Sequence, residues 1–397
     1  MKKQILKIVI VGHVDHGKST LIGRLLYDSH SIPLGKKEED LAFLTDQLRE
    51  EREQAKTIDT TQVFFRTKKR DYVVIDAPGH GELIKNMLTG ASLAQAGVLI
   101  VDAREGIEEQ TRRHAYLLKM LGIEQLIVAC NKMDLVGYEA GRFAQIKAEL
   151  LGILEGMRLK PRCVVPISAK AGENILRRSS LMPWYKGPAL MQALDTLAAV
   201  KRHVSALVLR FCCQDVYRMG QEDIVVGKVV AGRIKQGQRV SIAPSFRQAR
   251  IRAIRIFPGR LKQACAGQSI GLVLDGASPV KRGEVLVDTK APPLSTRSFQ
   301  GEVFWLSDEP LALDTALVLR CATQETECAA VRIQDRSSSA TLEVVEADAR
   351  RLQANEIGTV TLQTKDPVVI EKFSYLEELG RFTLEKKGNT AGVGVVG

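Results

Sequence analysis

A glycine-rich stretch near the start of the chain has the residue types and spacing of a phosphate-binding loop. Its sequence, GHVDHGKST, follows an apolar run over residues 5–11 and leads into an amphipathic helical pattern, a context that disfavours an ordinary turn. The spacing Gly-x-x-x-x-Gly-Lys-Ser lets backbone N–H groups and a helix N-terminus point at one anion, with the lysine on the β- and γ-phosphates and the serine on Mg²⁺. The residues expected to hold the phosphates are Gly12, His13, Val14, Asp15, His16, Gly17, Lys18, Ser19 and Thr20.

A second motif, DAPGH, ends the next apolar strand pattern. Asp76 can hold Mg²⁺ through water, the N–H of Gly79 can meet the γ-phosphate, and His80 can orient an attacking water. Standing alone, such a motif is more often an ordinary turn. Behind a strand and after a phosphate loop, it predicts hydrolysis of a nucleoside triphosphate.

Two further motifs indicate which nucleotide base is recognised. Asp134 of NKMD can accept hydrogen bonds from the N1 and N2 donors of guanine, which adenine lacks, so the motif predicts GTP rather than ATP. The SAK motif is expected to place a backbone N–H near the guanine oxygen. The residues expected at the base are Asn131, Lys132, Asp134, Ser168, Ala169 and Lys170.

A charged segment over residues 36–56 leads to a threonine that can reach the metal. The hydroxyl and carbonyl of Thr57 are expected to contact Mg²⁺ and the γ-phosphate, as in a nucleotide-sensing loop, although much of the segment also reads as a solvated helix. The candidate metal ligands are therefore Ser19, Thr57 and Asp76, and the catalytic candidates are His80, Lys18 and Thr57.

These motifs require a scaffold that brings strand ends together. Strand patterns alternate with helical patterns up to about residue 200, which predicts an α/β domain with a mostly parallel sheet, helices on both faces and ligands at the carboxyl ends of the strands. The expected strands are 5–11, 72–76, 98–102, 126–131 and 163–168, and the expected helices are near 18–28, 82–95, 108–121, 143–156 and 189–199.

From about residue 201 the pattern changes to short β-rich runs broken by Gly and Pro. The runs at 204–211, 223–230, 239–242, 250–257 and 269–273 predict an all-β barrel or sandwich, with a β-bulge within 250–256 where the alternation slips. A second boundary near 291–293 gives three expected domains: a GTP-binding domain over 1–200, a β-barrel over 201–290 and a shorter β-barrel over 291–397.

Composition excludes several classes of protein. The 397 residues are 45% hydrophobic, without an apolar run near 18 residues, so we expect a soluble protein with no membrane span or membrane partner. The seven cysteines are scattered and show no metal-ligand spacing, which indicates reduced thiols and a cytoplasmic location.

The formal charge of +11 is concentrated in the middle of the chain. Residues 201–290 hold 17 Lys and Arg against 6 Asp and Glu, whereas residues 291–397 hold 11 against 16. A basic domain of this kind attracts RNA or an acidic protein, or is merely soluble, and the sequence leaves these alternatives open.

Taken together, GHVDHGKST, DAPGH, NKMD and SAK resemble the translation-factor class of GTPases, and the two β domains look like the three-domain build of elongation factor Tu. Within that class, four short segments look like the GTPase subunit of bacterial sulfate adenylyltransferase: 89–92, 110–114, 182–188 and 214–217. The resemblance implies GTP and Mg²⁺ as cofactors.

The resemblance implies two functions of different kinds. The main expectation is a GTP-hydrolysing subunit that couples GTP hydrolysis to formation of adenosine 5′-phosphosulfate and pyrophosphate from ATP and sulfate, with a separate catalytic subunit as partner. The alternative is an elongation-factor-like translational GTPase that binds aminoacyl-tRNA or the ribosome through the basic middle domain. A regulatory switch for another complex is a weaker third possibility.

One departure from the family pattern concerns hydrolysis. Ala55 and Lys56 stand where the family usually has Gly-Ile, so the apolar gate that Val14 and that isoleucine would form over His80 loses one side. The hydrolysis rate could then change in either direction.

Overall fold

The computed structural model describes residues 5–31, 62–76, 94–198, 203–220, 222–256, 259–276, 279–339 and 343–397. The chain divides into two compact units. One comprises Met1–Val200 with Ser339–Thr341, and the other comprises Lys201–Ser338 with Leu342–Gly397.

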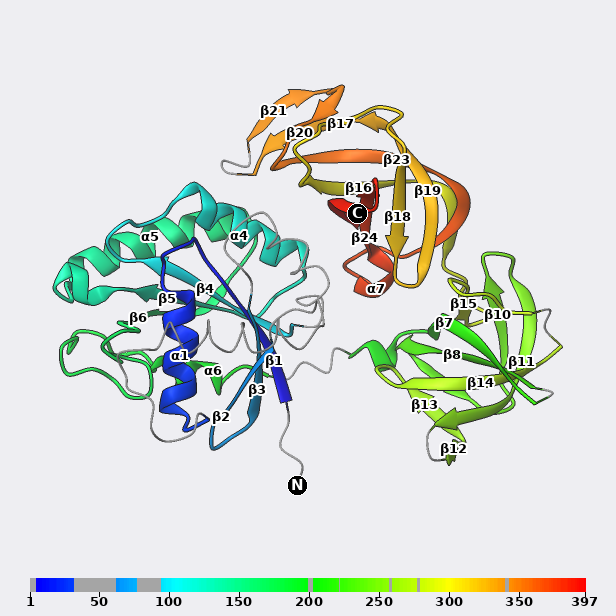
Figure 1. The fold of residues 1–397 in the computed structure, drawn as a ribbon, viewed down its shortest axis with the longest axis horizontal. Helices are drawn as coiled ribbons and strands as arrows, with labels where there is room; N and C mark the ends of the chain where they lie inside the picture. The colour runs from blue at the N-terminus through cyan, green and yellow to red at the C-terminus, as the bar shows by residue number, and fades with distance from the viewer. Residues whose placement is uncertain are drawn as a thin grey trace. The chain divides into compact units, whose positions relative to one another are not determined.

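The first unit is built on a six-stranded sheet with the order β2-β3-β1-β4-β5-β6 (Figure 1). Five neighbouring strands run parallel, and the edge strand β2 runs antiparallel to β3. The carboxyl ends of the parallel strands therefore meet at one edge of the sheet, where ligands bind in this class of fold. The strands are β1 (Ile5–Val11), β2 (Gln62–Arg66), β3 (Asp71–Asp76), β4 (Ala96–Asp102), β5 (Leu126–Asn131) and β6 (Pro161–Pro166).

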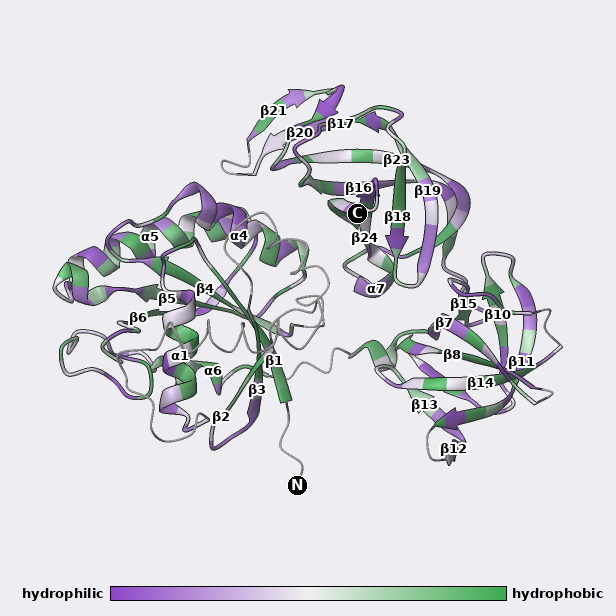
Figure 2. Cartoon of the chain, in the orientation of Figure 1, coloured by the Kyte–Doolittle hydropathy of each residue, from purple (hydrophilic) through white to green (hydrophobic). Residues whose placement is uncertain are grey.

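Helices cover both faces of this sheet. In Figure 1, α4 (Glu109–Met120) and α5 (Ala140–Gly156) lie on one side, and α1 (Lys18–Asp28) and α6 (Leu190–Leu194) on the other. Leucines at 21, 25 and 26 of α1 pack in one apolar cluster with alternate residues of β1. Figure 2 shows hydrophobic strands between helices that carry both colours, as expected when both sheet faces are buried.

Most of the predicted elements in this unit are confirmed, with three differences. Strand β6 ends at Pro166 rather than Ser168. Helix α6 stops at Leu194, because the N–H groups of Thr196 and Leu197 donate to carbonyls three residues back, those of Ala193 and Leu194, in tighter turns. Strand β2 was not predicted. The helix expected near 82–95 lies outside the described residues except for its last two positions, which precede β4.

The second unit begins with a closed antiparallel barrel. A short 3-10 helix, η4 (His203–Ala206), precedes it. The strand predicted over 204–211 was therefore wrong over 204–209, since the strand found there begins only at Arg210. The N–H of Gly232 donates to the Val204 carbonyl and holds the turn of η4. The predicted bulge is confirmed, since the register between β11 and β14 shifts between Ile251 and Ala253. The barrel strands, in order around the sheet, are β10 (Arg239–Ala243), β15 (Val285–Val287), β7 (Arg210–Met219), β8 (Glu222–Ala231), β14 (Ser269–Asp275) and β11 (Arg247–Ile256), and pairing of β11 with β10 closes it.

Three shorter strands extend this barrel. Strand β9 (Arg233–Lys235) pairs with β13 (Gln263–Cys265), and β12 (Gly259–Leu261) pairs with the end of β11.

A second closed barrel follows. It is formed by β16 (Leu294–Trp305), β25 (Asn389–Val396), β24 (Arg381–Lys386), β18 (Leu317–Cys321), β19 (Gln324–Ile333) and β23 (Glu356–Ile370), with β16 paired to β23. Smaller elements decorate it: β17 (Leu311–Ala312), β20 (Asp335–Ser338), β21 (Val344–Ala347), β22 (Arg351–Leu352) and α7 (Glu377–Gly380). The predicted fold class, an α/β domain followed by two β-barrels, is confirmed. The domain limits 1–200, 201–290 and 291–397 remain our proposal.

The two barrels share a buried contact within the second unit. Cys212 and Val285 of the first barrel join Val369 of the second in one apolar cluster. Beside it, the nearly buried guanidinium of Arg210 donates from Nε and Nη2 to Glu371 Oε1, at 2.9 and 2.6 Å. A buried charge is tolerated only when paired in this way.

Among the described residues, no helix has both the length and the apolar character that crossing a membrane requires.

Candidate functional site

The phosphate loop is the turn between β1 and α1. The backbone is left-handed at Asp15 (φ 67°) and Gly17 (φ 89°), and α1 starts at Lys18. A Cβ at Gly12 would lie 2.2 Å from Ile100 Cγ2, and one at Gly17 would lie 2.5 Å from Asn131 Nδ2. Both positions therefore require glycine, for close packing at the first and for packing and backbone conformation at the second.

The groups that this loop presents fit a phosphate chain. The backbone N–H groups of Val14, Asp15 and Gly17 donate to no described residue. The ammonium of Lys18 donates to the carbonyls of Gly12 and His13, at 2.7 and 2.8 Å, which fixes its charge against the loop. Unsatisfied N–H groups, a fixed cation and the N-terminus of α1 together form an anion-binding site.

One side chain joins three of the four nucleotide motifs. Asn131, at the end of β5, is buried; its Nδ2 donates to the carbonyl of His16 at 2.8 Å and its Oδ1 accepts from the N–H of Ala169 at 2.9 Å. The N–H of Met133 also donates to the Ile167 carbonyl at 3.1 Å. Asn131 thus holds the phosphate loop and the SAK segment at a fixed spacing.

A buried ion pair fixes the next residue of NKMD. Lys132 has a left-handed backbone (φ 61°), and its Nζ lies 2.6 Å from Oδ2 of Asp102, which ends β4 and is fully buried. Burial raises the pKa of Asp102, but the hydrogen bonds from Lys132 and from the N–H of Arg104 outweigh burial and hold the pKa below its usual value. Asp102 therefore remains a carboxylate that anchors Lys132.

The remaining base-side residues lie at the same edge. Asp134 is half-buried in the 3-10 helix η3 (Met133–Val136), and the buried Ser168 accepts a hydrogen bond at its Oγ from the N–H of Ala171. The N–H of Ala169 donates to Asn131, whereas the next N–H along the chain, that of the exposed Lys170, donates to no described residue.

The structure describes some of the metal-binding and catalytic candidates but not others. Ser19 and Thr20 lie in the first turn of α1. Asp76 ends β3 in register with Ile10 of β1, and so lies at the sheet edge that carries the phosphate loop. Three predicted residues lie outside the described part of the chain: Thr57, Gly79 and His80, and the same is true of Ala55 and Lys56.

Two buried histidines near the phosphate loop were not singled out as a pair from the sequence. His114, on α4, is 4% exposed; burial and the neighbouring charges of Lys18 and His13 lower its pKa to about 3. Burial also lowers the pKa of His16. The sequence does carry a signal for the burial of His114, because position 114 lies at helical spacing from Thr111 and Leu118 on the buried face of α4.

Comparison with known proteins adds the family. The model of the elongation factor Tu GTP-binding domain matches residues 3–202, that of elongation factor Tu domain 2 matches 223–287, and that of the eEF1A C-terminal domain-like family matches 298–397. The chain belongs to this family of elongation-factor GTPases. It is 37% identical to elongation factor 1-alpha of Pyrococcus woesei over 419 aligned residues, covering 99% of this chain and 97% of that protein. Elongation factor 1-alpha of Ignicoccus hospitalis is also 37% identical, with 100% and 96% covered.

These relatives correct the main functional expectation. The prediction of a sulfate adenylyltransferase subunit with a catalytic partner was wrong, since the relatives that match over the whole length are named elongation factor 1-alpha. Two of the segments behind that prediction contain residues that pack within the first unit, which is the GTP-binding unit. His114 is buried, and Trp184 donates to the Tyr138 carbonyl at 3.0 Å. Such residues report on packing rather than on a partner. GTP and Mg²⁺ as cofactors are confirmed by the family.

Proposed function

We propose that this chain is a translational GTPase of the elongation factor 1-alpha kind, which binds aminoacyl-tRNA in its GTP state and releases it after hydrolysis. The observation that carries this proposal is Asn131, which joins the phosphate loop, NKMD and SAK at one sheet edge. The similarity to elongation factors 1-alpha over 99% of the chain supports the translational role.

The roles of the site residues are part of the proposal. Lys18 and the free amides of the loop bind the phosphates, and Ser19 with Thr57 holds Mg²⁺, with Asp76 acting through water. His80 places the attacking water, and Asp134 accepts from the guanine N–H groups. When bound, Mg²⁺ neutralises phosphate charge as it develops. The protein's own contribution is position and charge, because phosphoryl transfer requires little covalent chemistry from the enzyme.

A basic ridge on the first barrel is suited to RNA phosphates. It lies where the β9–β13 pair meets the start of the β10–β11 ladder: Arg239 is in register with Arg250, and the N–H of Gln236 donates to the Lys262 carbonyl at 3.0 Å. The ridge consists of five exposed residues: Arg233, Lys235, Arg239, Arg250 and Lys262.

The charges of this ridge are largely uncompensated. None of its five residues forms an ion pair with a carboxylate among the described residues. In contrast, Arg247 and Arg255 on the same barrel pair with Glu284 and Glu222. Exposed cations without acidic neighbours attract polyanions most strongly.

The test is binding of aminoacyl-tRNA to the full chain at several salt concentrations, with GTP or GDP. We expect binding only with GTP, and log K should fall with log salt with a slope of about 0.7 to 0.9 per phosphate contacted. The substitutions Lys235→Ala and Lys262→Ala should each lower that slope by about one contact. Lys281→Ala is the matched control, since Lys281 is exposed near Glu284, at the other end of the β10–β11 ladder. GTP-independent or salt-insensitive tRNA binding would remove the proposal.

A further inference from the structure

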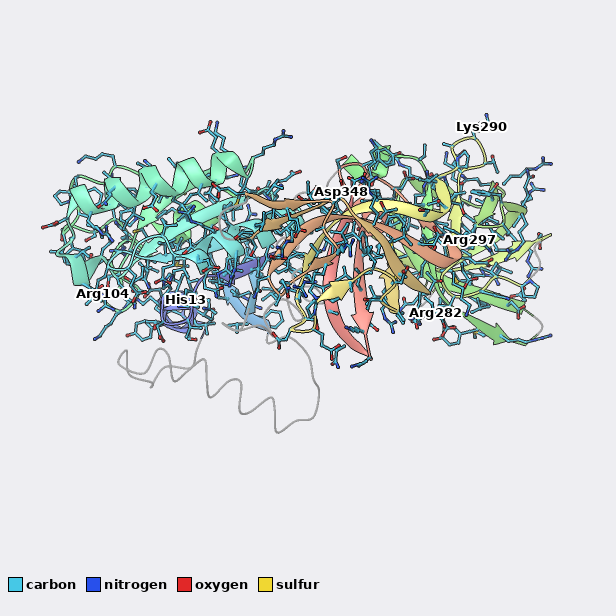
Figure 3. All side chains as sticks on the ribbon, turned by 90° about the horizontal axis from the view of Figure 1, so that it is seen from above. His13, Arg104, Arg282, Lys290, Arg297 and Asp348 are labelled. Atoms are coloured by element: carbon cyan, nitrogen blue, oxygen red, sulfur yellow. The ribbon has the colours of Figure 1, made fainter. Side chains whose placement is uncertain are left out.

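Four ionisable side chains lie together at the phosphate loop, and the function proposed above uses none of these side chains, although the backbone of His13 and His16 belongs to the loop expected to hold the phosphates. His13 and His16 come from the loop, and Glu105 and Glu108 from the segment between β4 and α4 (Figure 3 labels His13 and the neighbouring Arg104). Nε2 of His16 lies 3.3 Å from Oε2 of Glu105 and 3.9 Å from Oε2 of Glu108. One ligand atom from each of these three residues lies within 4.8 Å of the other two.

His16 is oriented as a ligand. Its side chain is fully buried, and its Nδ1 lies 3.4 Å from the carbonyl oxygen of Ile100. That contact favours the tautomer in which Nδ1 carries the proton, which leaves the lone pair of Nε2 directed at the two carboxylates. Nε2 has no hydrogen-bond partner among the described residues. Histidines that bind metals commonly donate their other ring N–H to a backbone carbonyl in this way.

The spacing is close to that of a tetrahedral site. Bonds of about 2.0 to 2.2 Å place ligand atoms about 3.3 to 3.6 Å apart. The distance from His16 to Glu105 already lies in this range, and Glu108 has to move only slightly. The other oxygen of Glu105, Oε1, is held by Arg104 at 3.2 Å, and Nε2 of the half-buried His13 lies 3.6 Å from Glu108.

The charges give a reason for a cation here. A lone pair and two carboxylates face one another beside the loop expected to hold the phosphates, so a cation among them would offset their repulsion of one another and of the phosphates. One imidazole nitrogen with two carboxylate oxygens suits Zn²⁺, whereas Mg²⁺ prefers six oxygen ligands.

We propose that His16, Glu105 and Glu108 bind one divalent transition-metal cation, of which Zn²⁺ fits best, at a site separate from the Mg²⁺ site of Ser19. The cation would connect the phosphate loop to the residue that precedes α4, because Glu108 stands immediately before Glu109. Its occupancy then biases the position of the loop that carries Lys18.

The test is titration of the full chain with Co²⁺, followed by displacement with Zn²⁺, in the presence of saturating Mg²⁺ and GDP so that the nucleotide site is filled. We expect one Co²⁺ per chain, with the visible absorption of a four-coordinate N/O site and no thiolate charge-transfer band. Glu105→Gln and Glu108→Gln should each weaken Co²⁺ binding at least tenfold.

Glu109→Gln is the matched control, because Glu109 lies next to the site but pairs with Arg113 on α4. It should bind Co²⁺ like the unmodified chain, and the GDP affinity of every variant shows whether the loop is intact. Equal Co²⁺ affinity in all three variants, a thiolate band, or no Co²⁺ bound beyond the nucleotide site would overturn the proposal. The last result would mean that His16 pairs directly with Glu105.

Discussion

Replacing Asn131 with alanine should damage both the stability of the GTP-binding unit and its nucleotide affinity. The substitution removes two hydrogen bonds and leaves the His16 carbonyl and the Ala169 N–H without their partner inside the protein. At about 1 to 1.5 kcal/mol for each bond, the local cost is about 2 to 3 kcal/mol. If all of this cost falls on the arrangement that binds nucleotide, the affinity for GDP drops by about 30- to 150-fold.

The matched control lies at the other end of the same strand. Gln125, immediately before β5, is also a buried amide: its Nε2 donates to the carbonyls of Ala198 and Gln95 at 2.7 and 3.3 Å, and its Oε1 accepts from the Ala198 N–H at 2.9 Å and from Arg162 Nη2 at 3.3 Å. Gln125→Ala should lose at least as much stability as Asn131→Ala but bind GDP within about twofold of the unmodified chain.

Hydrogen exchange followed by mass spectrometry measures the local stability of β5 and of the phosphate loop separately, and a fluorescent GDP analogue measures affinity. The reasoning fails if both variants lose GDP affinity equally, or if Asn131→Ala binds GDP normally while its loop amides exchange faster. Either result would mean that the contacts of Asn131 stabilise the fold without positioning the loop.

Three other perturbations follow from buried charges and a buried imidazole. Lys132→Met should destabilise the GTP-binding unit by about 3 kcal/mol, because it leaves a buried carboxylate unpaired, and adding Asp102→Asn should restore most of that loss in urea unfolding. Since the pKa of Asp102 is below its usual value, the stability that this carboxylate contributes is present above about pH 4 and declines as the pH falls further. The double variant, Lys132→Met with Asp102→Asn, should not show this decline. His114 has a pKa of about 3 against an ordinary value of 6.5, so between these pH values the unfolded chain binds one more proton than the folded chain. The free energy of unfolding should therefore fall by up to about 1.4 kcal/mol per pH unit on acidification. A His114→Gln variant with the same pH slope would contradict this. Arg210→Met should strip Glu371 of its partner and loosen the contact between the barrels by about 3 kcal/mol, seen as faster exchange in β7 and β23, and unchanged exchange there would refute it.

Much of the site could be predicted from the sequence, because its motifs are local. The glycines at 12 and 17 determine where the chain can turn against a neighbour, and the order of strands and helices requires a parallel sheet. Once the sheet is parallel, residues that end its strands must gather at one edge, so the phosphate loop, NKMD and SAK were expected together before any contact was known.

The subgroup could not be predicted in the same way. Segments such as 110–114 and 182–188 resembled one subgroup, yet His114 and Trp184 within them pack inside the GTP-binding unit. Short identities that serve packing do not distinguish partners, and similarity over the whole chain was needed to correct the function.

Side-chain partnerships across distant segments were determined only by the tertiary structure. Asn131 reaches His16 across 115 positions of sequence, and Lys132 finds its carboxylate on the neighbouring strand. The lone pair of His16 meets Glu105 and Glu108 only after β4 lies beside β1. A sequence pattern records which groups a segment offers, whereas hydrogen bonds and ion pairs depend on distances of a few ångströms that only the packed sheet and helices set.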